Sequence, residues 1–301
     1  MLRKAQLAIA MLAVLPAAAA QEHIADLKHS LRIEYQYVRS GSIDFNDDQI
    51  DLGRTDTHVY ILSGVYSLND RWKIFGSIPY VQKRHKGALA HDPNVDFFAY
   101  TPPDLRVVDD GAYHGDFQDI YVGTQFLAVD GPLSVSPYIS FGTPMSDYPI
   151  YGNAIIGKQV WEVPVGVTIG FTPYFSDWSF EADISYVFSE EVIGVNLDYW
   201  LLHAAARYYI TPRFAPRVFL TQRIAPHALG WDDFREDADW DTEAGFHHDR
   251  LLRHAYLNGG IGIDYVVSDR YSISATYYET IDQDIMANID SAFTFALTRR
   301  F

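Results

Sequence analysis

The chain ends in the stretch S-A-F-T-F-A-L-T-R-R-F, which runs from Ser291 to Phe301. Large apolar residues occupy alternate positions, at Phe293, Phe295 and Leu297, and small or polar residues fill the positions between them. This period of two is typical of a β-strand with one apolar and one polar face. Chain termini fray, so a soluble protein seldom leaves several phenylalanines on its last strand. The stretch therefore predicts a strand whose apolar face meets lipid, with an edge strand of a soluble sheet as the alternative.

The same stretch resembles the C-terminal targeting strand of bacterial outer-membrane barrels, which typically ends in Phe. Arg299 departs from that pattern, because members usually carry an apolar residue or Tyr at this position. In a membrane barrel the last strand must pair with the first to close the cylinder. The resemblance implies an assembly signal read by the barrel-assembly machinery, formed by Phe293, Phe295, Leu297 and Phe301.

Residues 1–20 have the layout of a secretory signal peptide. Arg3 and Lys4 form a basic start, an apolar centre follows, and the segment ends in small residues up to Ala20. No later segment has the roughly 20 uncharged apolar residues that a membrane helix needs. We therefore predict an exported chain with a signal peptide over 1–20, no helical anchor, and one barrel domain over 21–301.

The composition excludes several classes of protein. The formal charge is −16, and no basic cluster interrupts the acidic balance, which argues against a nucleic-acid partner. The chain has no cysteine, so disulfides and thiolate metal sites are impossible. Its 301 residues show no linker, repeat or low-complexity segment. One closed sheet is the simplest interpretation, and no cofactor is predicted.

Alternating segments flank a series of turn-forming residues. Five tight turns are expected at Asn69-Asp70, Asp130-Gly131-Pro132, Ser176-Asp177, Pro212-Arg213 and Ser268-Asp269-Arg270. Each turn joins two strands, and the first and last strands add two more, which gives about twelve, an even number as single-chain bacterial barrels require. We predict an all-β fold: a single transmembrane antiparallel β-barrel of about twelve strands in the Gram-negative outer membrane, with short periplasmic turns and long extracellular loops.

Other features of the sequence fit this fold. The 21 Tyr and 6 Trp suit the aromatic girdles that outer-membrane barrels place at both interfaces. Pro79 and Pro137 each remove a ladder donor, so we expect a local bulge near each of them. The long connections His85–Gly115 and Ala225–Asp249 are expected outside the cell.

The polar faces of the strands collect charge. Asp183 and Arg207 are predicted to lie close together on neighbouring strands, at similar height above the periplasmic turns. Such residues can line a polar path, or they can form a salt-bridged filler that stiffens a narrow barrel, and about twelve strands leaves both readings open. The predicted lumen-lining residues are Arg32, Glu34, Lys73, Asp119, Glu181, Asp183, His203, Arg207, Arg217, Arg223 and Asp264.

Two other chemistries have candidate residues in the sequence, a calcium site and a lipid hydrolase. The acidic segment Trp231–Glu243 offers the oxygen ligands that calcium takes, but it lacks the glycine and ligand spacing of a helix-loop-helix calcium site. We interpret it as a solvated loop and predict no metal site. An outer-membrane lipid hydrolase would need a Ser-His pair, and the sequence has no G-x-S-x-G motif. We therefore predict no enzyme and no catalytic residue.

Four motifs in the middle of the chain carry a family resemblance. They are S-I-P-Y-V (Ser77–Val81), F-Q-D-I-Y-V-G (Phe117–Gly123), L-S-V-S-P-Y-I-S-F-G-T-P (Leu133–Pro144) and Y-G-N-A-I-I-G (Tyr151–Gly157). Together they resemble the transporter-like outer-membrane barrels grouped with the meta-pathway of phenol degradation. The resemblance covers about the middle third of the chain. It implies a barrel that passes small compounds, often aromatic or apolar, and it carries over no catalytic residue.

The predicted function is a passive channel or transporter for small solutes, with aromatic or apolar compounds as candidates. Phe97, Phe98 and Tyr100, in a long extracellular loop, are predicted to form an apolar access site. The predicted partners are the outer-membrane lipid bilayer, the barrel-assembly machinery and a small-molecule solute. The alternative is a closed structural or binding barrel that presents the acidic loop to a partner.

Overall fold

A computed structural model describes most of the chain. The described residues are 29–45, 48–87, 105–230, 243–284 and 287–301. The predicted signal peptide lies outside them, and so do residues 97–100 and 231–242. None of the helices in the described ranges is long and apolar enough to cross a membrane.

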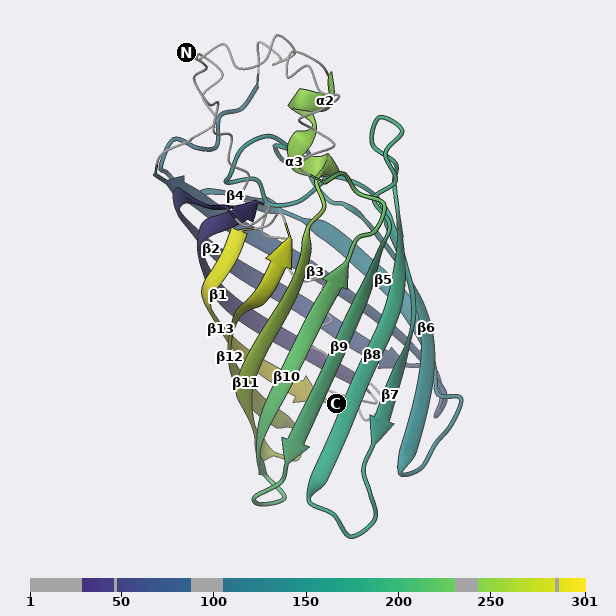
Figure 1. Cartoon of the computed structure of the whole chain (residues 1–301). Coiled ribbons are helices and arrows are strands. Elements are labelled where there is room, and N and C mark those ends of the chain that lie inside the picture. Colours follow the sequence, from purple (N-terminus) through teal and green to yellow (C-terminus); the bar gives the residue numbers. More distant parts are fainter. Residues whose placement is uncertain (1–28, 46–47, 88–104, 231–242, 285–286) are drawn as a thin grey trace, which may run out of the picture.

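The described chain forms one antiparallel sheet that closes on itself (Figure 1). β2 pairs with β3, and β1 pairs with both β2 and β13, so the sheet has no free edge between its first and last strands. The strands are β1 (His29–Phe45), β2 (Asp48–Ser67), β3 (Trp72–Lys86), β4 (His114–Phe117), β5 (Asp119–Phe126), β6 (Leu133–Pro144), β7 (Glu162–Phe171), β8 (Trp178–Ser189), β9 (Tyr199–Tyr208), β10 (Phe214–Ile224), β11 (Ala255–Ser268), β12 (Tyr271–Asp284) and β13 (Ala287–Arg300).

β4 and β5 are two parts of one strand position. Both pair with β3, with the partners Tyr80↔Phe117 in β4 and Ser77↔Tyr121 in β5. The pairing shifts by one residue between these two points, and Pro79 lies in that interval. The thirteen segments therefore make a closed twelve-stranded barrel, which confirms the predicted fold class.

The expected bulges occur at both prolines. The shift between β4 and β5 lies beside Pro79, whose carbonyl accepts a hydrogen bond from the backbone N–H of Gln118 at 3.1 Å. A second shift separates Gln125↔Tyr138 from the isolated bridge Val129↔Val135, and Pro137 lies between these pairs. A residue without an N–H cannot continue a regular ladder, and the local shifts accommodate it.

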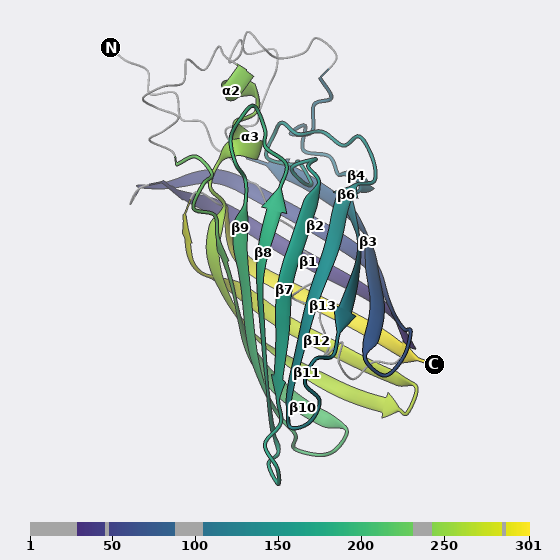
Figure 2. The same ribbon diagram turned by 90° about the vertical axis from the view of Figure 1, so that its right-hand side faces the viewer.

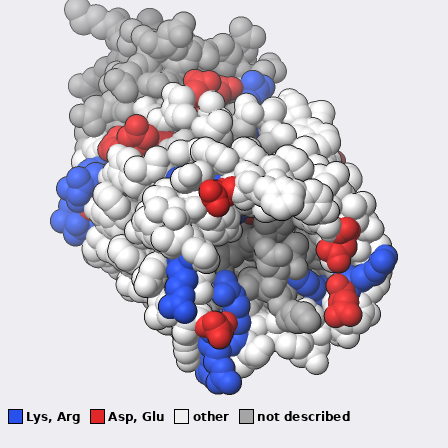
Figure 3. All heavy atoms as spheres, turned by 90° about the horizontal axis from the view of Figure 1, so that it is seen from below, with Lys and Arg blue, Asp and Glu red and all other residues white. Residues whose placement is uncertain are grey.

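The connections divide into short and long, as the turn residues predicted. Each of the five expected turns joins two consecutive strands, and these turns lie at the end of the barrel toward which the C-terminus points (Figures 1 and 2). The helices α2 (Glu243–Phe246) and α3 (His248–Leu251) belong to a long connection at the opposite end. Seen from the end with the short turns, charged side chains lie at scattered positions among mostly white surface (Figure 3).

The two faces of the strands differ as the alternation predicts. On β13 the side chains of Phe293, Phe295 and Leu297 are exposed, whereas the intervening Thr294 and Ala296 are buried. Register pairs Tyr35 of β1 with Phe295, so the closing strand continues the apolar outer surface without a break. A closed ladder satisfies every strand's backbone inside the membrane, and an apolar outer face meets lipid without cost.

Candidate functional site

The barrel interior holds the polar side chains that the sequence pattern placed there. All of the predicted lumen-lining residues lie on the inner face, and every one except Asp264 is at most 8% exposed. Asp264 is only slightly more exposed, with 18% of its side chain accessible. Their role in solute passage stays a prediction.

An ion-pair cluster lies in the half of the lumen nearest the short turns. The Nη1 of Arg207 is 3.0 Å from a carboxylate oxygen of Glu181, and its Nε is 3.1 Å from one of Asp264. Arg217 joins the cluster through Asp264, at 3.7 Å. Two arginines and two carboxylates thus share one site contributed by β8, β9, β10 and β11.

The predicted contact between Asp183 and Arg207 is wrong. Register places Asp183 opposite His203 and Arg207 opposite Ser179, so the two side chains are offset along the strands. Asp183 instead accepts hydrogen bonds from the hydroxyls of Thr168 and Tyr138, each at 2.8 Å. His203 is paired with the hydroxyl of Thr221 at 3.0 Å.

Near β1 the inner face forms a second ion pair. The guanidinium of Arg32 lies 2.9 Å from the carboxylate of Glu34, two residues further along the same face. Arg32 also donates to the hydroxyl of Ser274 at 3.2 Å, which connects the pair across β13 to β12. Charged groups on this wall are therefore compensated locally.

Tyrosines cap the carboxylates higher in the lumen. Glu162 accepts one hydrogen bond from the hydroxyl of Tyr121 and another from that of Tyr199 at 3.2 Å. Asp119 accepts one from Tyr148 at 2.6 Å. Glu162 and these tyrosines are not among the predicted lumen-lining residues, since Tyr in a barrel strand is equally expected in an interfacial girdle. The parity of Glu162 on its strand was the one available signal.

A connecting segment folds into the barrel at the end opposite the short turns. Tyr148 and Ile156, from the connection between β6 and β7, pack in one buried cluster with the inward-facing Val59 and Val81. All six residues from Tyr151 to Ile156 are buried. These residues, which we call the inserted segment, are six of the seven in the Y-G-N-A-I-I-G motif. They occupy space inside the barrel and so narrow the lumen.

Two aspartates hold the backbone of this inserted segment. Asp109 accepts hydrogen bonds from the backbone N–H groups of Asn153 and Ala154, each at 2.8 Å. Asp249, on α3, accepts one from Gly152 at 2.8 Å. Carboxylates that accept backbone N–H groups make strong charge-assisted hydrogen bonds. The three long connections are thereby tied to one another across the mouth of the barrel.

Lysines complete the electrostatics of the mouth. The Nζ of Lys83, on the inner face of β3, donates to the carbonyl of Ile155 at 3.0 Å. Lys158 is half-buried just beyond the inserted segment, and desolvation lowers the pKa of its ammonium well below the usual value. The nearby guanidiniums of Arg223 and Arg250 lower that pKa further. Additional positive charge is therefore unfavourable in this part of the lumen.

The predicted access site and nearly all of the acidic segment lie outside the described residues. Phe97, Phe98 and Tyr100 lie outside, and so does all of the acidic segment Trp231–Glu243 except Glu243. Within the ranges that the structure describes, no three His, Asp or Glu side chains are grouped as a metal ion would require.

Comparisons with known proteins agree with the fold. No protein-family model and no curated protein sequence matches this chain. Among solved structures it is similar to an outer-membrane channel from Pseudomonas putida F1, with a TM-score of 0.65 and 10% identity, over 91% of this chain and 96% of that one. It is also similar to the NanC porin (TM-score 0.51, 9% identity, 90% and 100% covered) and to the translocator domain of the autotransporter NalP from Neisseria meningitidis (TM-score 0.51, 8% identity, 95% and 92% covered). At this identity the similarity establishes the fold alone, and the predicted β-barrel fold is confirmed.

Proposed function

We propose that this protein is a passive outer-membrane channel for small solutes, with aromatic or apolar compounds as candidate cargo. The observation that carries the proposal is the polar inner face, which extends from the Arg207 cluster through Glu162 to the mouth at Lys83. Hydrogen-bonding groups along the whole lumen can replace the hydration shell of a passing solute. A barrel that served only as a solid structural element could be filled by apolar side chains instead.

The candidate cargo comes from the resemblance to the barrels grouped with the meta-pathway of phenol degradation. The Y-G-N-A-I-I-G motif, one of the four that carry this resemblance, forms the inserted segment held by Asp109 and Asp249. We infer that this segment restricts the size of solutes that pass. An apolar access site at Phe97, Phe98 and Tyr100 remains part of the proposal, and a deletion of 97–100 that left uptake of aromatic compounds unchanged would remove it.

One observation favours the alternative of a closed barrel. The inserted segment is buried and bonded on several sides, as a permanent plug would be. The two possibilities differ in whether the described contacts leave a conducting path beside the segment.

Planar bilayer conductance of the purified protein tests the proposal. We expect discrete conductance steps for the wild type, and a shift of ion preference toward cations when Arg207 and Arg217 are both replaced by Ser, because two lumen cations are removed. Asp109→Ala should enlarge the steps by releasing the segment. A wild type with no steps, combined with an Asp109→Ala variant that conducts, would establish the closed barrel instead.

A further inference from the structure

Four polar side chains that lie next to one another on the inner face leave buried polar atoms unpaired. The Nε of Arg223, the hydroxyl of Tyr256, the Nδ2 of Asn258 and the side-chain amide of Gln283 are buried, and none has a hydrogen-bond partner in the described part of the chain. Arg223, Tyr256 and Asn258 are 5%, 4% and 1% exposed. Buried polar atoms in folded proteins are nearly always paired, so a group of four unpaired ones indicates a missing partner.

The four residues lie together. Register pairs Arg223 of β10 directly with Tyr256 of β11, and Tyr256 directly with Gln283 of β12. Asn258 is the next inward residue of β11 after Tyr256. The groups thus occupy one row across three adjacent strands and the position next to it, near the end of the lumen opposite the short turns.

The unpaired atoms of the row are mostly hydrogen-bond donors, with the Oε1 of Gln283 as an acceptor among them, and this surplus of donors favours an anion. Arg223 Nε–H and the Asn258 amide nitrogen can only donate, and Tyr256 and Gln283 can donate as well. In the described residues no carboxylate lies within 4.0 Å of the Arg223 guanidinium, unlike Arg32, Arg207 and Arg217, which all have one. A buried cation without a counter-ion is costly, and a bound carboxylate would offset that cost while accepting from several donors.

Among the described residues, no carboxylate supplies that counter-ion. Glu162 is the acidic side chain whose charge acts on both Tyr199 and Tyr256, and its oxygens already accept from Tyr121 and Tyr199. The half-buried Lys158 lies close enough to Arg223 for their two positive charges to repel each other. The positive charge of Arg223 therefore has no counter-ion among the described residues.

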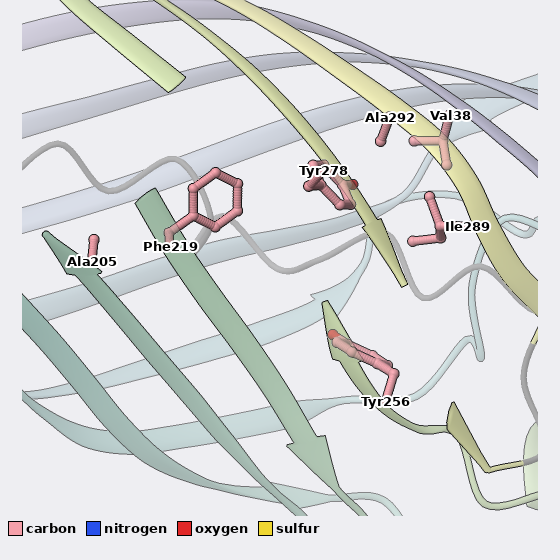
Figure 4. Close-up of a cluster of buried hydrophobic side chains, with 7 residues drawn as sticks. All are labelled: Val38, Ala205, Phe219, Tyr256, Tyr278, Ile289 and Ala292. Carbon is pink, nitrogen blue, oxygen red and sulfur yellow. The ribbon is translucent and has the colours of Figure 1, made fainter. Parts of the chain in front are cut away.

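Aromatic and apolar walls flank the row. The guanidinium carbon of Arg223 lies 3.8 Å from the centre of the Tyr199 ring, in a cation–π arrangement. The Tyr256 ring belongs to a buried cluster with Phe219 and Tyr278, contributed by β11, β10 and β12 (Figure 4). The buried Leu201 is the register partner of Arg223 on β9. A ligand held at Arg223 would have apolar surface on either side.

We propose that this row is a binding site for a small aromatic carboxylate, with the carboxylate at Arg223, Tyr256, Asn258 and Gln283 and the ring against Tyr199 and Leu201. Small aromatic carboxylates would then be the substrate class of the channel. The physiological role of the site rests on the proposed channel function. Binding itself does not depend on conduction, so the two can fail separately.

Isothermal titration of the purified, folded protein in detergent tests the site with benzoate, benzyl alcohol and acetate. Benzoate should bind at least about tenfold more tightly than benzyl alcohol, which lacks the charge, and more tightly than acetate, which lacks the ring. Arg223→Gln should remove the preference for benzoate, and Tyr256→Phe should weaken benzoate binding about fivefold by removing one hydroxyl. Arg213→Gln, an exposed arginine at the turn before the same strand, should bind benzoate as the wild type does.

Equal affinity of the wild type for benzoate and benzyl alcohol would overturn the proposal, since water alone would then satisfy the row. Unchanged benzoate binding in a folded Tyr256→Phe variant would overturn it as well, even if Arg223→Gln does not fold. Conductance steps measured on the same preparations report on the channel independently. A protein that conducts without binding benzoate refutes only the site, and one that binds benzoate without conducting refutes only the channel.

Discussion

The ion pair between Glu181 and Arg207 allows a quantitative test of the lumen. The two side chains are 1% and 8% exposed and their charged atoms are 3.0 Å apart. At an effective dielectric constant of about 20 their attraction is about 5 kcal/mol, and the cost of desolvating both groups offsets most of it. Arg207 keeps Asp264 at 3.1 Å when Glu181 is replaced. We therefore expect Glu181→Gln to lower the free energy of unfolding by about 2 kcal/mol.

A double-mutant cycle isolates the interaction. Glu181→Gln, Arg207→Met and the double variant would be unfolded in urea from lipid vesicles, with tryptophan fluorescence as the signal. The coupling energy should be about 1–3 kcal/mol, as for residues in direct contact. A matched control cycle uses Asp183→Asn in place of Glu181→Gln. Asp183 is the register partner of His203, which lies four residues from Arg207 along β9, so Asp183 is roughly 13 Å from Arg207.

The control cycle should give a coupling below about 0.5 kcal/mol. If Arg207 coupled equally strongly to Asp183 and to Glu181, the register of β8 against β9 would be wrong, and with it the assignment of ion pairs in the lumen. A coupling near zero in both cycles would show that the lumen is wet enough to screen its charges.

The remaining predictions concern assembly and packing. Phe301→Asp should deplete the heat-modifiable folded band from the outer membrane, because it places a charge on the exposed apolar end of the closing strand. Arg300→Asp, on the other face of the same strand, should leave the band unchanged. Equal depletion by both variants would contradict an assembly signal in the apolar row. Gly260→Ala should lower the free energy of unfolding by roughly 1–3 kcal/mol through overpacking, since the added carbon would lie 2.4 Å from Cζ of Phe219. Gly64→Ala meets nothing closer than 3.6 Å and should be near neutral in the same urea titration.

Much of the interior could be predicted because side-chain direction in a strand is a local property. Residues two apart share a face whatever the strand pairs with, so parity alone placed Arg217 and Arg223 inside and Phe293 and Phe295 outside. The turn residues are equally local, which is why the strand count and the two ends of the barrel followed from the chain itself. The partner of Arg207 was mispredicted for the complementary reason, because contacts depend on how far one strand is offset against the next.

Side-chain periods, turn residues and the terminal strand act over a few residues each, so a closed, lipid-facing barrel with a charged interior could be predicted from the chain alone. Which charges meet depends on the stagger of the folded strands, which brings Glu181 rather than Asp183 to Arg207. The position of the segment around Asn153 inside the barrel likewise depends on the folded chain, because Asp109 and Asp249 hold it from connections far away in the sequence. Such contacts exist only after the sheet has closed and brought the three connections to one mouth, and no local pattern encodes them.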